Sequence, residues 1–424
     1  MVHTDGLITD LSSTRIIIVS LYYWPEPAGS APPVQQMAEA LARLGSRVTV
    51  LTARPAYPEM RVYPEYRDGA RDCEQYNGID IERIPIGSCK PGGGILSRLT
   101  TELSFALRVW WKLLGISHYT HLISLSPSIL AVLAGIFGSF RPTRRTAIVH
   151  DLQSGLALSL KMSRYGFVLS MLEWLERTTL NRLDHVITLS ESMAETLKAI
   201  GVISPITIIP PTVDDDFISP QPEPSGPVTA IYSGNLGRKQ GLSQLLDLAV
   251  FIENRDLAIS LIIRGDGNYR EKLKQRAEEL GLRKLRIEPL RRTEELSDAL
   301  AEGHIYLVPQ DPAGAPFAMP SKIYSIMAAG RPFICTAEVA SPLDKLRKSS
   351  DAFVICKPND PVHFGIALEI LMMNPAERLR LGMNGRDYVK KYAGKTACER
   401  AYGALVSSQS IITVRNDHRG RSRP

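Results

Sequence analysis

Strand-like and helix-like segments alternate along most of this chain, and that alternation limits its possible folds more than any other feature. In the first half, apolar strand patterns are expected at residues 15–20, 47–52, 79–84, 121–124, 146–149, 185–189 and 206–211. Helical patterns lie between several of them, one of them at residues 35–44. Strands that alternate with helices indicate a parallel sheet with helices packed on its faces.

The alternation restarts after a stretch that is poor in apolar residues. Residues 214–228 contain four prolines and three aspartates, which is typical of a linker between domains. Beyond it, strands are expected at 229–233, 257–264, 285–288 and 305–308, with helices at 243–251, 269–280 and 294–302. A chain of 424 residues can bury two cores of this kind.

We therefore predict an α/β protein with two Rossmann-like, doubly wound domains that face a cleft. A helical pattern at 375–406 is expected to cross back to the first domain. The predicted divisions are an N-terminal tail at 1–14, a first domain at 15–212, a linker at 213–228, a second domain at 229–405 and a basic tail at 406–424.

The segment 305–334 has the pattern of a binding site for a phosphate or diphosphate. A strand runs into a loop, and a second element is expected to begin with Pro320 at its first helical position. Ser321 can donate or cap there, Lys322 adds a positive charge, and Gly330 ends the helix. Backbone N–H groups at a helix N-terminus favour an anion. An ordinary βα unit with a surface lysine is the alternative reading.

Two glycine-containing loops follow strands of the second domain. Gly234, Asn235, Arg238 and Lys239 belong to a loop whose glycines allow close approach to an anion and whose cations can neutralise phosphate. This loop matches neither the dinucleotide nor the P-loop pattern, and a plain glycine turn with surface cations is the alternative.

A second turn, with Gly265 and Asp266, lies at the same predicted sheet edge, where a simple β-turn would serve equally. In the first domain, His150 and Asp151 follow a strand, so the histidine can reach the cleft and form a hydrogen bond there. The alternative is a structural His–Asp pair. Gly29 and Ser30 belong to the first strand-to-helix loop, which overlooks the same cleft.

The net charge of +6 is placed unevenly. Residues 83–172 carry ten Lys and Arg against two acidic residues, and they include the aromatic helical run 104–115. A basic helix with aromatic residues can lie on an anionic membrane, but a helix packed on a sheet explains the pattern equally well. No nucleic-acid motif is present, so nucleic acid is not an expected partner.

Membrane spans, metal sites and secretion are not expected. The uncharged run 122–140 is broken by Pro127, and we interpret it as a strand followed by a buried helix rather than a transmembrane segment. The five cysteines are scattered without a close pair, which fits a reducing cytosol and no zinc knuckle. No secretory signal is visible before the first strand.

The ordered set of motifs resembles that of GT-B glycosyltransferases of the large retaining family 4, in a branch similar to bacterial colanic-acid and exopolysaccharide enzymes. The resemblance covers roughly residues 15–405 and rests on YYWPEPAGS at 22–30, LTARPAYPEMRVYPEYR at 51–67, HDLQ at 150–153, ITLSESM at 187–193, YSGNLGRKQGL at 232–242, IIRGDGNYREKL at 262–273 and PSKIYSIMAAGRP at 320–332.

The resemblance implies transfer of a hexosyl-type sugar from a nucleotide-sugar donor, with retention at the anomeric carbon. Lys239, with Arg238, would hold the diphosphate, Gly29 would donate a backbone N–H near the reacting phosphate, and His150 would lie beside the donor sugar. Ser321 and Lys322 would lie at the nucleotide end. No metal or other cofactor is expected.

Two departures from the family pattern concern the donor site. The family usually carries two glutamates eight positions apart, and here those positions are Phe317 and Ser325. Replacing a carboxylate that binds the ribose would cost about 1–3 kcal/mol of binding unless another group compensates.

The main hypothesis is a cytoplasmic glycosyltransferase of cell-surface polysaccharide biosynthesis, acting on a glycan or polyprenyl-diphosphate-linked acceptor and peripheral at the inner face of the membrane. The alternative is a non-catalytic, glycosyltransferase-like subunit that binds a partner or membrane. A GT-B epimerase would need acidic residues in the cleft, and no convincing pair is evident.

Overall fold

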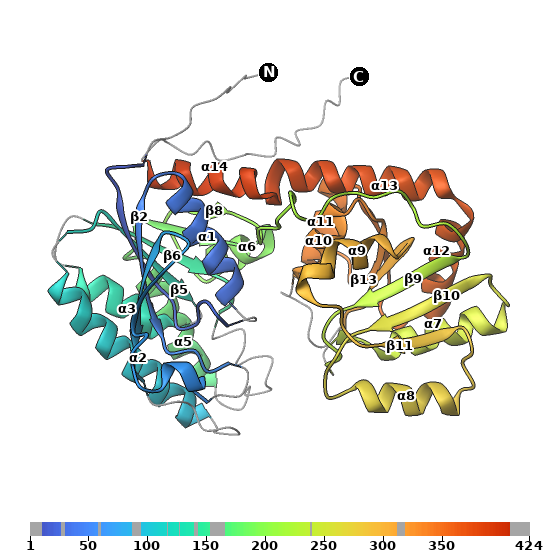
Figure 1. Ribbon diagram of the computed structural model, residues 1–424, viewed down its shortest axis with the longest axis horizontal. Helices are drawn as coiled ribbons and strands as arrows, with labels where there is room; N and C mark the ends of the chain where they lie inside the picture. Colours follow the sequence, from blue (N-terminus) through green and yellow to red (C-terminus); the bar gives the residue numbers. More distant parts are fainter. Residues whose placement is uncertain are drawn as a thin grey trace, which may run out of the picture.

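The computed structural model shows two α/β lobes that lie side by side and are bridged along one side by helices from the end of the chain (Figure 1). The residues that it describes are 11–26, 30–57, 61–86, 95–116, 118–126, 128–139, 143–152, 166–237, 240–311 and 319–407.

The first lobe is built on an eight-stranded sheet with the order β3-β4-β2-β1-β5-β6-β7-β8. All neighbouring strands are parallel except β3 and β4, which are antiparallel. The strands are β1 (Arg15–Val19), β2 (Arg47–Ala53), β3 (Cys73–Tyr76), β4 (Ile79–Ile84), β5 (His121–Ser126), β6 (Arg144–Val149), β7 (His185–Thr188) and β8 (Ile206–Ile208).

The central strand β1 shows why the apolar runs of the sequence form this sheet. Ile16 and Ile18 pack into a core with helix α1 (Ala31–Arg43), whereas Ile17 packs on the opposite face with helix α2 (Ile95–Gly115). A strand buried on both faces needs apolar residues throughout, which produces a continuous run rather than an alternating one.

Helices cover both faces of the first sheet. The face opposite α1 carries α2, α3 (Ile129–Gly138), α5 (Gly166–Leu180) and α6 (Glu191–Ala199). The interpretation of residues 122–140 as a strand and a buried helix is confirmed, since they contain β5 and α3. Within the described part of the chain, no helix is both long and apolar enough to cross a membrane.

The second lobe contains a six-stranded, fully parallel sheet with the order β11-β10-β9-β12-β13-β14. Its strands are β9 (Val228–Ser233), β10 (Ile259–Arg264), β11 (Leu285–Glu288), β12 (Ile305–Val308), β13 (Phe333–Thr336) and β14 (Phe353–Cys356). Its helices are α7 (Ser243–Asn254), α8 (Arg270–Glu279), α9 (Leu296–Ala301), α10 (Lys322–Ala328), α11 (Pro342–Ser350), α12 (Pro361–Met373) and α13 (Pro375–Tyr388). The predicted fold class, with two doubly wound domains, is confirmed.

The last helix returns to the first lobe, as predicted. A short π-helical turn, Val389–Ala393, follows α13, and α14 (Lys395–Val406) then lies along α1 (Figure 1). Tyr402 of α14 belongs to the core of the first lobe, and Glu399 accepts a hydrogen bond from Arg43 at 2.6 Å. The two lobes are therefore joined both by the linker and by this helix.

The segment between the sheets contacts the second lobe in several places. Ile218 is buried there, and Glu223 accepts two hydrogen bonds from the Arg378 guanidinium, at 2.7 and 2.8 Å. Arg331 donates to the Pro222 carbonyl at 2.8 Å. These contacts hold the proline-rich segment on the protein surface.

Three sequence expectations need correction. Helix α1 begins at Ala31 rather than at residue 35, because prolines fit the first helical turn, where their missing N–H is not needed. Helix α10 begins at Lys322 rather than at Pro320, because the preceding turn is closed by tighter bonds to the Pro320 and Ser321 carbonyls. Strand β3 was not expected, since its polar, exposed sequence lacks the pattern of a buried strand.

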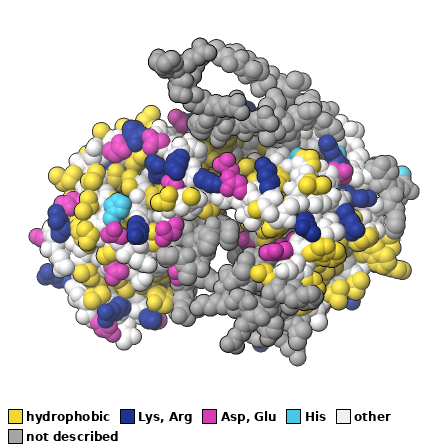
Figure 2. Space-filling view, turned by 180° about the vertical axis from the view of Figure 1, so that it is seen from behind, with side chains coloured by type: hydrophobic (Ala, Val, Ile, Leu, Met, Phe, Trp, Pro, Cys, Tyr) yellow, Lys and Arg dark blue, Asp and Glu magenta, His cyan; other side chains and the backbone are white. Residues whose placement is uncertain are grey.

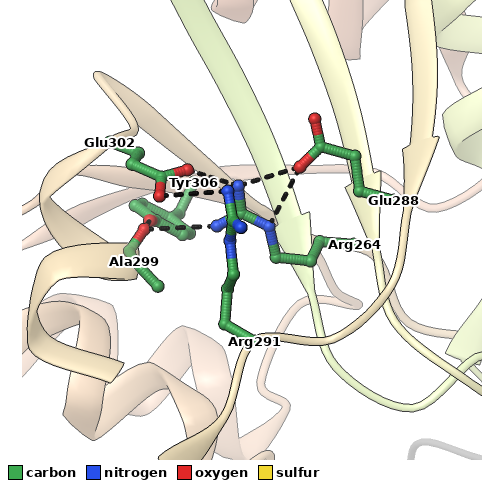
Figure 3. A network of polar contacts seen from close by, with 6 residues as sticks. All are labelled: Arg264, Glu288, Arg291, Ala299, Glu302 and Tyr306. Carbon is green, nitrogen blue, oxygen red and sulfur yellow. Dashed lines mark hydrogen bonds and ion pairs between the residues drawn. The ribbon is translucent and has the colours of Figure 1, made fainter. Parts of the chain in front are cut away.

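A buried arginine ties the carboxyl end of β10 to α9 (Figure 3). The Arg264 side chain is 1% exposed, and its guanidinium donates to Glu288 at 3.0 and 3.3 Å and to Glu302. The Arg264 carbonyl also accepts the Gly234 N–H at 3.0 Å. This residue therefore connects the loops that follow β9 and β10 to the rest of the lobe.

We predict that Arg264→Met lowers stability by about 1–3 kcal/mol, because two partly exposed carboxylates lose their charged donor. The measurement is the midpoint of denaturant unfolding. The matched control is Arg292→Met, since Arg292 is 78% exposed and pairs only with nearby Glu295 in the described structure. Equal shifts for the two variants would contradict the prediction.

Candidate functional site

Two glycine loops at the carboxyl edge of the second sheet touch through their backbones. The Gly234 carbonyl oxygen lies 1.9 Å from the position that a Cβ would occupy on Gly265, so only glycine fits there. The Leu236 N–H donates to the Asp266 carbonyl at 2.9 Å, and Gly234 has a φ of 149°, which favours glycine. The sequence-predicted residues Gly234 and Gly265 are thus brought together.

Lys322 lies beside the same loop. Its Nζ is 3.9 Å from the centre of the Tyr232 ring, in a cation–π contact. A Cβ on Gly234 would lie 2.7 Å from this Nζ, so the ammonium group is next to the glycine backbone. Tyr232 is itself fixed by a hydrogen bond from its hydroxyl to the Asn235 carbonyl at 2.8 Å. The start of α10 and the loop after β9 therefore form one site.

The environment of Lys322 favours binding of an anion. The side chain is half-buried, and desolvation alone lowers the pKa of Lys322 to about 7. In the described part of the chain, no carboxylate forms an ion pair with it. A buried ammonium group without a counter-ion gains a favourable interaction when an anion enters.

The two serines of this segment differ in position. Ser321 occupies the N-cap position of α10, is exposed, and forms no side-chain capping bond. Ser325 lies one helical turn further along and is half-buried. Both hydroxyls lie on the element that carries Lys322.

The side chain of Asp266 is already engaged within the second lobe. One carboxylate oxygen pairs with Arg270 at 3.2 Å, and the other accepts the Leu290 N–H at 3.3 Å. Asn235 is exposed in the neighbouring loop. The geometry gives Asp266 a role in holding its turn in place.

A structural role for Gln244 was not predicted from the sequence. Its amide donates to the Gln310 carbonyl at 2.8 Å and accepts the Asn359 N–H at 3.1 Å. A Cβ on Gly241 would lie 2.7 Å from the Gln310 carbonyl carbon, so glycine is required at this close approach as well. These contacts join the end of the loop after β9 to the segment after β12. The only sequence signal was the third glycine of the loop.

In the first lobe, His150 directly follows β6 and is half-buried. Burial lowers the pKa of His150 to about 4, so the ring is neutral near neutral pH. A neutral imidazole has one donor and one acceptor nitrogen. Asp151 has an exposed side chain, and its backbone carbonyl accepts a hydrogen bond from Ser126 at 3.3 Å.

The first strand-to-helix loop contains another residue without a predicted role. The Glu26 carboxylate is buried and accepts N–H groups of Tyr23, Ala56 and Tyr57 at 3.2, 3.0 and 2.9 Å. It thereby links this loop to the segment after β2. Ser30, at the N-cap position of α1, makes no side-chain capping bond.

Four positions of the predicted donor site lie outside the described residues: Gly29, Arg238, Lys239 and Phe317. Their predicted roles therefore stay predictions.

In the part of the chain that the structure describes, no cluster of His, Cys, Asp or Glu could hold a metal ion. Between the two lobes the surface is hollowed (Figure 2).

Family comparisons match both halves of the chain. Residues 28–212 match the family described as "Glycosyl transferase 4-like domain", and residues 213–388 match "Glycosyl transferases group 1". A candidate colanic acid biosynthesis glycosyl transferase, WcaI of Escherichia coli K12, is 27% identical over 373 residues, with 83% of this chain and 90% of that protein covered.

Solved glycosyltransferase structures share the fold. Sucrose-phosphate synthase from Thermosynechococcus elongatus superposes with a TM-score of 0.71 at 18% identity, covering 92% of this chain and 98% of that one. Anabaena HepE, solved with UDP and glucose, gives a TM-score of 0.67 at 14% identity over 93% of this chain and all of its own. Together with the two family matches, this likeness shows that the chain belongs to the GT4-type glycosyltransferases with the GT-B fold.

Proposed function

We propose that the protein is a retaining hexosyltransferase that moves a sugar from a nucleotide-sugar donor to a lipid-linked saccharide acceptor. The observation that carries this proposal is the half-buried ammonium group of Lys322 beside the Gly234 backbone, with no carboxylate partner in the described structure. A nucleoside diphosphate would supply the missing negative charge. The relationship to a candidate colanic acid enzyme supports a role in cell-surface polysaccharide biosynthesis.

The donor site would act mainly on the leaving group. As the bond between the anomeric carbon and the phosphate oxygen breaks, negative charge develops on the diphosphate. Lys322 can stabilise that charge, and we propose that Lys239 and Arg238 act with it. These cations can neutralise the diphosphate, so we propose that transfer requires no metal ion.

In the proposed retaining step, the acceptor oxygen bonds to the anomeric carbon on the face that the diphosphate leaves. The acceptor proton passes to the departing phosphate oxygen, so atoms and charges balance without a protein base. A His150 ring with a pKa of about 4 is a weak base. Its proposed role is therefore a hydrogen bond to the donor sugar.

UDP is the first nucleotide to test, because HepE was solved with UDP and glucose. The usual glutamate at the ribose position is Ser325 in this chain, so the ribose contact would come from a neutral hydroxyl. We propose that Ser321 and Ser325 serve the nucleotide end of the donor.

A non-catalytic, partner-binding subunit is the second candidate, and the departures at Phe317 and Ser325 favour it. The two functions differ in a measurable way. An active enzyme needs Lys239 and His150 for polysaccharide synthesis in the host, whereas a binding subunit would tolerate alanine at both positions.

We predict that UDP affinity falls as the pH rises from about 7.5 to 9, by up to about tenfold per pH unit. The sign follows from proton linkage: the free Lys322 has a pKa of about 7, so its charged fraction keeps falling as the pH rises above that value, whereas the diphosphate binds the charged form. Phosphate groups, with a second pKa of about 6, are already ionised there. Isothermal titration calorimetry measures this dependence.

Lys322→Met should weaken UDP binding at pH 7 and remove its pH dependence. Lys322→Arg is the matched control, because a guanidinium stays charged over this range and should bind with a flat pH profile. An unchanged, pH-dependent affinity in Lys322→Met would exclude Lys322 from the diphosphate site.

We predict that His150→Ala lowers the transfer rate by roughly 10²-fold through loss of the proposed hydrogen bond to the donor sugar, and that Lys239→Ala lowers it by roughly 10²–10³-fold through loss of leaving-group stabilisation. His150→Asn should retain more activity than alanine, since an amide can still donate and accept. The measurement is sugar transfer from a panel of nucleotide sugars. Full activity in both alanine variants would contradict the assigned roles.

A further inference from the structure

Helix α2 exposes a continuous apolar stripe. Leu99, Leu103, Leu107, Trp111 and Leu114 are spaced by four or three residues, so they share one face of the helix. Their exposed fractions run from 40% for Leu114 to 73% for Trp111. A stripe of this length is not needed for the fold, because the opposite face already packs through Phe105, Val109 and Leu113.

The stripe continues onto neighbouring helices. Phe137 at the end of α3 is 55% exposed, and α5 adds Met171 and Trp174, which are 49% and 55% exposed. Figure 2 shows hydrophobic side chains gathered at the lower edge of the right-hand lobe, which is the side that α2, α3 and α5 occupy in Figure 1. We call these eight residues the α2–α5 surface. Large apolar patches of this kind mark interaction sites.

Positive charge surrounds the α2–α5 surface. Arg108 is exposed on α2 beside Trp111, and Arg177 and Arg182 are exposed at the end of α5 and just after it. Lys112 is 45% exposed and pairs with Glu82 at 2.7 Å. The acidic residues of α2 and α5 are less exposed, since Glu102 and Glu173 are half-buried and Glu176 is buried. An occupant of this surface should therefore be apolar and negatively charged.

A second apolar stripe shows that exposure alone does not identify the occupant. Val362, Ile366, Ile370 and Met373 of α12 are 44–73% exposed at similar spacing. Helix α12 contains no Lys or Arg, and its acidic residue Glu369 is half-buried and pairs with Arg255. Of these two stripes of the described structure, the α2–α5 surface is the one that combines apolar side chains with tryptophan and exposed arginines.

We propose that the α2–α5 surface docks on the anionic face of a lipid bilayer, with α2 lying along the interface. Exposed tryptophans prefer the headgroup region, and flanking cations attract anionic lipids. This surface lies outside the donor site, and its binding to lipid does not depend on the proposed transfer reaction. Docking would hold the first lobe where a lipid-linked acceptor resides.

The test is co-sedimentation of the full chain with vesicles of phosphatidylcholine, with and without phosphatidylglycerol. We expect binding to the anionic vesicles that weakens with added salt. The double variant Leu107→Ser/Trp111→Ser should lose roughly tenfold or more in vesicle affinity, and Arg108→Glu should lose several-fold. The matched control Ile366→Ser/Ile370→Ser on α12 should bind as the natural protein does.

Several outcomes would overturn the proposal. Equal binding to neutral and anionic vesicles would contradict docking on an anionic bilayer. An equal loss of vesicle affinity in the α12 control would show that the α2–α5 surface is not the docking site. A dimer that dissociates in Leu107→Ser/Trp111→Ser, without vesicle binding by the natural protein, would identify a second copy as the occupant. The thermal unfolding midpoint of each variant shows whether it is folded, and this control does not depend on the transfer reaction.

Discussion

The contact between the Gly234 and Gly265 backbones is the constraint on which the candidate site depends. A side chain on Gly265 would collide with the Gly234 carbonyl, so the loops after β9 and β10 can meet only as bare backbone. Arg264 stabilises this contact. Its carbonyl accepts the Gly234 N–H, and its guanidinium donates hydrogen bonds to Glu288 and Glu302. Lys322 then has a rigid glycine surface beside which its ammonium group lies.

The rest of the fold positions this site relative to the first lobe. Helix α14 leaves the second lobe and packs on α1, and Lys345 of α11 forms an ion pair with Glu195 of α6 across the two lobes. His150 and Lys322 both lie in segments that follow the carboxyl ends of parallel strands. In α/β folds, ligands usually bind at this edge of the sheet. His150 supplies a neutral ring and Lys322 a side chain that has no ion-pair partner among the described residues, which suits the proposed reaction, in which charge separates between sugar and diphosphate.

Much of the fold could be predicted from the sequence because parallel strands buried on both faces give long apolar runs. The expected strands of both sheets formed, and the returning C-terminal helix followed from its long helical pattern. The predicted starts of α1 and α10 were wrong, because the effect of a proline depends on its position within the helix. The polar strand β3 gave no signal because it pairs at a sheet edge.

The site was predictable only in outline. Glycine and lysine motifs at strand ends indicated Gly234, Gly265 and Lys322, because strand ends of one sheet share an edge. The partners that give these residues their properties come from distant segments and could not be predicted. Tyr232 under the Lys322 ammonium group and Gln244 beneath the Gln310 carbonyl depend on how helices pack, not on local sequence.

The most direct test of the proposed donor site is a crystal structure of the protein with UDP. We expect a diphosphate oxygen within hydrogen-bond distance of the Lys322 Nζ and against the Gly234 backbone, with the ribose directed toward Ser325. A diphosphate bound away from both Lys322 and Gly234 would contradict it.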